Sequence, residues 1–93
     1  MDSHLLRVVG VLEAAFPDGV DDADVLPLLI VLSEGMGEEN VGITAGAFLR
    51  MHEAEAVWLV TEALSKSGNR ERRARVERLR QLLVSHGWDP DED

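Results

Sequence analysis

FPDGV, at residues 16–20, runs directly into DDAD at residues 21–24 and VLPLLIVL at residues 25–32. These segments are a turn, an acidic helix start and eight consecutive apolar residues. The apolar run has no polar side to offer to water, so other segments must cover it all round. It is also far shorter than the ~20 residues that cross a bilayer. We therefore predict that residues 25–32 form the buried centre of the fold, round which the other segments pack.

The length of 93 residues indicates one domain with a small core, because such a chain buries only ~60–65% of its unfolded surface. Little room remains for a deep cleft beside that core, which argues against an enzyme. The chain has no cysteine, which excludes a disulfide, a thiolate nucleophile and a zinc–thiolate site. Residues 1–4 lack the basic then apolar layout of a signal peptide, so we expect a cytoplasmic protein.

Charge is distributed unevenly along the chain. Residues 1–65 carry −10, residues 66–88 carry +5 and residues 89–93 carry −4, which gives the net charge of −9. A negative field repels phosphate backbones and anionic lipid at long range. The charge therefore disfavours nucleic acid and membranes as partners, and only the arginine-rich segment could act against it.

The first helix is predicted by the spacing of its apolar residues. Ser3 is a suitable N-cap, and one helical face carries Leu5, Val8, Val9, Leu12, Ala15 and Phe16. Pro17 ends this helix, and residues 16–19 suit a type I turn. Gly10 costs ~1 kcal/mol relative to alanine, which is tolerable if another helix crosses closely there.

The aspartates of residues 21–24 open the second helix. They do not form an EF-hand loop, because Ala23 stands where that loop needs glycine. We interpret them as favourable charge at a helix N-terminus. With Asp24 as N-cap, Pro27 falls at the third helical position, where its missing N–H costs nothing. Gly35 then serves as the C′ glycine.

The third helix begins at Glu38 and Glu39, which suit its positive end. Its expected inner face is Val41, Ala45, Phe48 and Leu49. Gly42 and Gly46 are four residues apart, so we expect another helix to approach closely along that side.

A break near His52 separates the third helix from a fourth, because a compact fold of this length needs one there. The fourth helix carries the apolar residues Val57, Leu59, Val60, Ala63 and Leu64. Trp58 lies beside them, and we expect it to be half buried.

The last helix should run from Arg70 to His86, after a linker at residues 67–69. Its inward residues are Val76, Leu79, Leu82 and Leu83. Gly87 suits the C′ position, and Trp88 would then pack back on Leu83 in a Schellman ending. The domain therefore spans residues 1–88, and residues 89–93 form an acidic frayed tail.

The arginines of the last helix are the candidate interaction residues. The candidates are Arg70, Arg73, Arg78 and Arg80. On a helical wheel they spread round the helix, whereas a groove-reading helix presents its bases together. Glu71–Arg75 and Arg73–Glu77 are possible i,i+4 pairs. Two alternatives stay open, charge balance within the chain and a surface that binds a partner.

Three of these basic residues, Arg70, Arg72 and Arg73, crowd the first turn of the helix, whose N-terminus already carries about half a positive charge. We expect compensating acids from residues 21–24 or residues 53–62 to lie opposite. If none does, the turn is free to meet an acidic partner.

No motif in the sequence carries chemistry. His4, His52 and His86 are single and far apart, and there is no dinucleotide-binding, Walker or nucleophile-elbow signature. Glu53 and Glu55 lie two residues apart, so on a helix they point different ways. We therefore expect no catalytic residue, no metal and no cofactor.

Four segments together resemble a known family: FPDGV (16–20), DVLPLLIVL (24–32), the glutamate-led third helix, and ERLRQLLVSHGW (77–88) followed by aspartates. Most of the chain resembles the actinobacterial, largely mycobacterial, family of small all-helical proteins classed as a domain of unknown function. The chain departs from the usual pattern at residues 51–53, where that family has a loop with a proline, and at residues 69–73, where it has acids. The resemblance implies a helical fold and a bacterial cytoplasmic setting, and it brings no catalytic residues.

These observations predict a compact all-α single domain of about five helices packed round a buried central second helix. The function that they favour is a non-catalytic protein-interaction module, a monomer or weak homodimer, with exposed apolar or arginine-bearing surface on the last two helices. The protein partner is unknown. The alternative is a helix-turn-helix regulator that binds nucleic acid, against which the spread arginines and the charge of −9 weigh. A steep salt dependence of binding to random duplex would favour the alternative.

Overall fold

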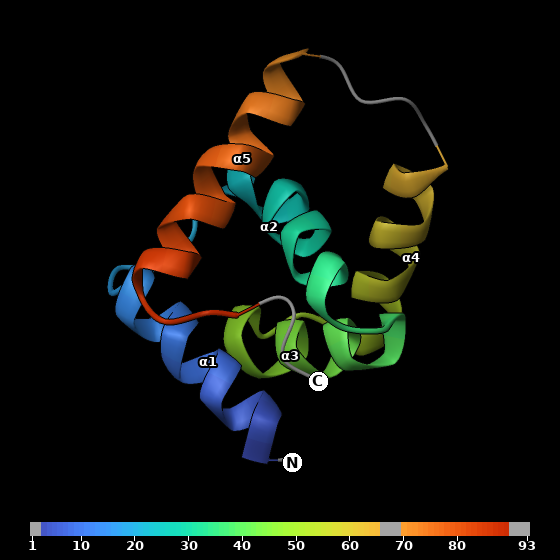
Figure 1. The fold of residues 1–93 in the computed structure, drawn as a ribbon. Coiled ribbons are helices and arrows are strands. Elements are labelled where there is room, and N and C mark those ends of the chain that lie inside the picture. The colour runs from blue at the N-terminus through green and yellow to red at the C-terminus, as the bar shows by residue number, and fades with distance from the viewer. Residues whose placement is uncertain (1–2, 66–69, 90–93) are drawn as a thin grey trace.

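A computed structural model describes residues 3–65 and 70–89, and these residues form five α-helices (Figure 1). The helices are α1 (Ser3–Ala15), α2 (Asp22–Gly35), α3 (Glu38–Leu49), α4 (Glu53–Leu64) and α5 (Arg70–Ser85). This arrangement confirms the predicted all-α fold. The linker expected at residues 67–69 and the tail beyond residue 89 lie outside the described residues.

α2 is the central helix. It packs against α3, α4 and α5, and Figure 1 shows it between α4 and α5. Its fully covered side chains are Leu28, Leu29, Val31 and Leu32, each at most 1% exposed. Val25, Leu26 and Ile30 are partly exposed. The apolar run therefore forms the predicted buried centre, with its flanks near the surface.

The start of α2 differs from the prediction. Asp21 is the N-cap, with extended backbone, so the helix begins at Asp22 and not after Asp24. Pro27 consequently lies inside the helix, where its ring removes the amide hydrogen that would bond to the Ala23 carbonyl. Ala23 is exposed, so water can bond to this carbonyl. Pro27 therefore lies beyond the first turn and removes one helical hydrogen bond, contrary to the prediction that its missing N–H costs nothing.

The chain leaves α1 and α2 in two different backbone conformations. After α1, the Gly19 amide donates to the Phe16 carbonyl at 3.0 Å, and Gly19 has a φ of 92°, which confirms the predicted turn. Gly35, however, is the last residue of α2 and not a left-handed C′ glycine. The residue after it, Met36, is extended (φ −154°, ψ 160°), so the chain leaves α2 without a left-handed residue.

α3 and α4 pack closely through small residues. A Cβ at Gly42 would lie 3.0 Å from Val57 Cγ2 and 3.2 Å from the Glu53 carbonyl oxygen, so a larger residue would require α4 to shift by a few tenths of an ångström. A Cβ at Gly46 would lie 3.3 Å from Glu53 Cγ. The predicted close approach is confirmed. The predicted break is also confirmed, since His52 is the N-cap of α4.

The end of α5 forms the predicted Schellman motif. The Trp88 amide donates to the Leu83 carbonyl at 2.9 Å, and the Gly87 amide donates to the Val84 carbonyl at 3.0 Å. Gly87 has a φ of 101°, which a side chain would strain. The motif turns the Trp88 side chain into the core, where it is 5% exposed and shares a cluster with Val8 of α1.

Substitution of two helical glycines by alanine should have opposite effects. Gly42→Ala should lower the free energy of unfolding by about 1 kcal/mol, because overpacking costs ~1–3 kcal/mol and better helix propensity returns only ~1. Gly10→Ala should raise it by ~0.5–1 kcal/mol, because a Cβ there meets nothing within 4 Å. The close helix crossing that would make Gly10 tolerable is therefore not found at this position. Urea unfolding measures both, and equal stabilisation by the two changes would contradict the close α3–α4 contact.

Candidate functional site

Ion pairs fasten α5 to α2. Arg75 Nη1 donates to Asp24 Oδ1 at 3.0 Å, and Arg78 Nη2 lies 3.6 Å from the same oxygen. Arg80 donates from Nε and Nη2 to the two carboxylate oxygens of Glu34, at 2.7 and 2.6 Å. This bidentate hydrogen bonding raises the pKa of Arg80 above its ordinary value. Two of the four candidate interaction residues, Arg78 and Arg80, thus have partners within the chain.

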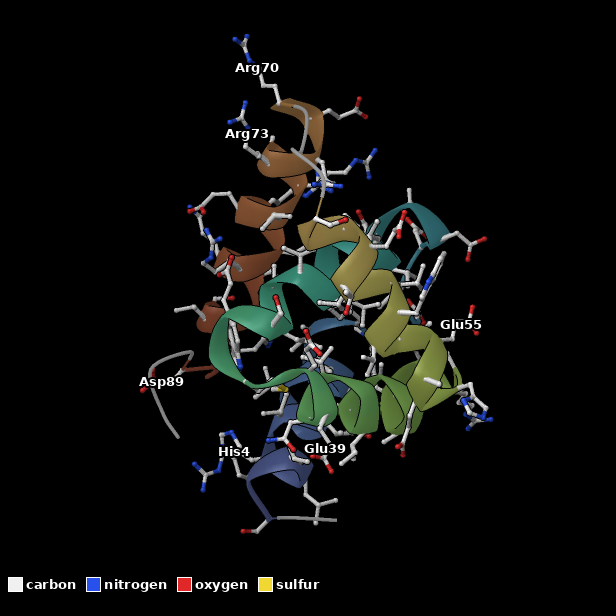
Figure 2. The ribbon with its side chains drawn as sticks, turned by 90° about the vertical axis from the view of Figure 1, so that its right-hand side faces the viewer. His4, Glu39, Glu55, Arg70, Arg73 and Asp89 are labelled. Carbon is white, nitrogen blue, oxygen red and sulfur yellow. The ribbon has the colours of Figure 1, made fainter. Side chains whose placement is uncertain are left out.

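Arg70 and Arg73 lie at the other end of α5. Both are exposed, and Figure 2 shows them projecting from the start of the helix, away from the other helices. Among the described residues neither forms an ion pair. Of the acids at residues 21–24, Asp24 contacts α5, but it pairs with Arg75 and Arg78 and not with Arg70 or Arg73 in the first turn.

Charge pairs within α5 follow the predicted pattern in part. Glu71 and Arg75 form the expected i,i+4 pair at 3.6 Å. Glu77 instead contacts Arg80, one turn further along, and accepts a hydrogen bond from Gln81 Nε2 at 3.1 Å. The Arg73–Glu77 pair therefore does not form.

Neither a cluster of metal-binding side chains nor a helix that could span a membrane is present among the described residues. Residues 3–65 and 70–89 contain no group of three or more histidine, cysteine, aspartate or glutamate side chains that could hold a metal ion. No helix within these two ranges has the length and apolar character needed to cross a membrane.

A hollow of about 720 Å³ lies where the turn after α1 meets the end of α3. Its aromatic walls are Phe16 and Phe48, whose ring centroids are 6.3 Å apart. Glu13 and Arg50 also line it, and both are exposed to water. Exposed charges of opposite sign without a buried polar group do not constitute a preorganised catalytic arrangement.

The outer face of α4 is the more unusual surface. Trp58 is 61% exposed, which corrects the expected half burial. Ala54, Val57 and Thr61 lie on the same side at helical spacing, and these four residues, here called the α4 outer face, line a hollow of about 530 Å³. Thr61 Oγ1 donates to the Val57 carbonyl at 2.9 Å, so its hydroxyl already has a partner. The face is therefore mainly apolar.

The presence of two apolar stripes on α4 explains why the sequence does not predict the exposure of Trp58. The buried stripe consists of Ala56, Val60 and Ala63, which are at most 4% exposed. It is made of small side chains, while the largest side chain of the helix, Trp58, points outward. The sequence signal was present as a second i, i+3, i+4, i+7 series from Ala54 to Thr61, but the two series overlap in sequence.

Acidic side chains border the α4 outer face. Glu53 and Glu39, the latter from α3, line the same hollow, and both are exposed. Glu53 and Glu55 are about 200° apart on the helix, so they lie on opposite sides of Ala54. Figure 2 shows Glu39 and Glu55 on α3 and α4. Within the described residues, none of the three glutamates forms an ion pair.

Comparison with known proteins identifies the family. Residues 3–92 match the family model DUF3349, described as a protein of unknown function. The chain belongs to the DUF3349 family. No curated protein and no solved structure matches it. The family assignment agrees with the resemblance to a family of unknown function, and DUF3349 itself supplies no activity from which site residues could be transferred.

The two tryptophans of this DUF3349 chain should respond differently to a neutral fluorescence quencher. In a Trp58→Phe variant the remaining Trp88, at 5% exposure, should be quenched several-fold less than Trp58 in a Trp88→Phe variant, at 61%. Stern–Volmer constants measured with acrylamide check this. Equal constants for two folded variants would contradict either the docked Trp88 or the exposed Trp58.

Asp24→Asn should destabilise the domain by up to about 1 kcal/mol more than Asp22→Asn at low salt, since Arg75 and Arg78 lose their shared carboxylate. Asp22→Asn is the matched control. It lies in the same helical turn but is exposed, so only the dipole contribution of ~0.3–1 kcal/mol is at stake. The difference between the variants should shrink at high salt, as measured by urea unfolding. A difference that is absent at low salt would mean that the ion pairs do not stabilise α5 on α2.

Proposed function

We propose that this domain is a non-catalytic protein-interaction module, and that a protein partner binds the α4 outer face. The observation that carries the proposal is the exposure of Trp58 at the centre of that face. Tryptophan is among the residues that contribute most binding energy at protein interfaces. Exposed apolar patches bordered by polar residues are typical of interaction sites.

Other exposed apolar residues lack this context. Leu6 on α1 is 56% exposed and Val84 on α5 is 50% exposed, but neither lines a hollow described above. Apolar residues scattered singly on a surface are ordinary and need no function. Trp58 differs because three further residues extend its apolar surface along α4.

The arginines support the interaction proposal over the nucleic-acid alternative. Arg78 and Arg80 contact carboxylates of α2, which reduces the positive charge available to a phosphate backbone. Arg70 and Arg73 are retained in the proposal as a separate site for an acidic segment of a partner. The proposed setting is the cytoplasm of an actinobacterium, and the proposed state is a monomer or weak homodimer.

Affinity capture with matched variants tests the proposal. Immobilised wild-type domain, Trp58→Ser and Leu6→Ser are exposed to an extract of the native cell, and bound proteins are identified. We expect a protein that the wild type and Leu6→Ser retain equally and that Trp58→Ser loses at least about tenfold, as for a central interface residue. Equal retention by all three folded proteins would show that the α4 outer face is not the binding surface.

A further inference from the structure

We infer that the partner segment at the α4 outer face is an amphipathic helix with lysine or arginine beside its apolar stripe, an inference that rests on the proposed interaction function. Its apolar side chains would cover Trp58 and the residues in line with it. Its basic side chains would face the bordering glutamates.

Charge complementarity selects a basic partner. α3 and α4 together carry five glutamates and no lysine or arginine. Two of them, Glu39 and Glu53, line the same hollow as the α4 outer face, and Glu55 follows Ala54 in the helix. None of these three forms an ion pair in the described part of the chain. Opposite charges at the rim of an interface accelerate association and exclude partners of the wrong charge. An acidic or phosphate-bearing partner would meet repulsion here.

The dimensions of the face select a helix. Ala54 to Thr61 spans two helical turns, or about 10 Å along the axis. A partner helix that places anchors at i, i+3 or i+4, and i+7 spans the same length. The hollow of about 530 Å³ is open enough for such side chains to enter from one side.

Other modes of peptide binding fit less well. Strand addition needs an exposed sheet edge, and the described residues are helices and loops. Recognition of polyproline helices needs grooves lined by several aromatic side chains, whereas Trp58 is the sole aromatic residue of this face. A symmetric contact with a second copy would bring the bordering glutamates of both chains together.

Fluorescence anisotropy with labelled peptides tests the inference. The probe is a leucine–lysine peptide of about five helical turns, ~18 residues, with leucines at i, i+3, i+4 and i+7. One control peptide has glutamate in place of lysine, and another keeps the lysines but has serine in place of leucine. The full chain is used at low salt, and circular dichroism verifies that each variant is folded.

Two variants and a matched control assign the binding to the face. Trp58→Ser, and the triple variant Glu39→Gln, Glu53→Gln and Glu55→Gln, should each raise the Kd of the leucine–lysine peptide about tenfold. The control, Asp18→Asn, Asp21→Asn and Asp22→Asn, removes equal charge from exposed positions elsewhere and should change the Kd less than about threefold. Glutamine preserves the packing of Glu53 against Gly46.

The inference is supported if the leucine–lysine peptide binds at least about tenfold more tightly than both control peptides and both variants weaken it. It is overturned if the glutamate peptide binds as well, if the control variant weakens binding as much as the triple variant, or if no binding occurs up to roughly millimolar peptide. Concentration-dependent shielding of Trp58 without peptide would assign the face to self-association and also overturn it.

Failure of this inference is distinguishable from failure of the proposed function. If affinity capture yields a Trp58-dependent protein and the leucine–lysine peptide does not bind, the interaction role stands and the basic helix is rejected. If capture shows no dependence on Trp58, the interaction role of this face is rejected whatever the peptide does.

Discussion

The structure depends on covering a helix that has no polar side. The apolar run of α2 would expose side chains in every direction, so α3, α4 and α5 pack against it on different sides. Full burial of Leu28, Leu29, Val31 and Leu32 is the result. Burial of each such side chain contributes ~1.5–3 kcal/mol, and α2 buries more large apolar side chains than any other described helix.

Charged groups set the register of that packing. An apolar contact by itself is non-directional, whereas Asp24 near the start of α2 and Glu34 near its end contact different arginines of α5. Pairs at two separate points favour one axial position and one rotation of α5. Their free energy is modest, because the groups are partly exposed, and their effect is on which packing forms more than on how stable it is.

Sequence features that act through the local backbone could be predicted. Pro17 ends α1, Gly42 permits close helix packing, and the Gly87–Trp88 ending forms the Schellman motif. The predicted N-cap of α2, Asp24, is wrong, because several neighbouring aspartates suit that position. The N-cap in the structure is Asp21.

The candidate site was less accessible to prediction. The side of α4 that turns inward depends on its neighbours, which the spacing of its own residues does not reveal. Val57 lies beside Gly42 of α3, and Ala56 and Val60 are buried in the core, which leaves Trp58 exposed to water. The partners of the α5 arginines could not be predicted for the same reason. A helical wheel shows the directions of these side chains and not the carboxylates of α2 that three of them contact.

The Schellman ending also constrains when the protein can fold during synthesis. Trp88 belongs to the same buried cluster as Val8 and Leu12 of α1. The two ends of the described chain therefore contribute to a single core. A ribosome-bound chain that still holds α5 in the exit tunnel lacks that cover, and the apolar run of α2 would stay partly exposed. Contacts between segments so far apart in sequence form only after a long loop closes. Folding therefore finishes after translation of Trp88, and until then the nascent chain exposes apolar surface of the kind that chaperones bind.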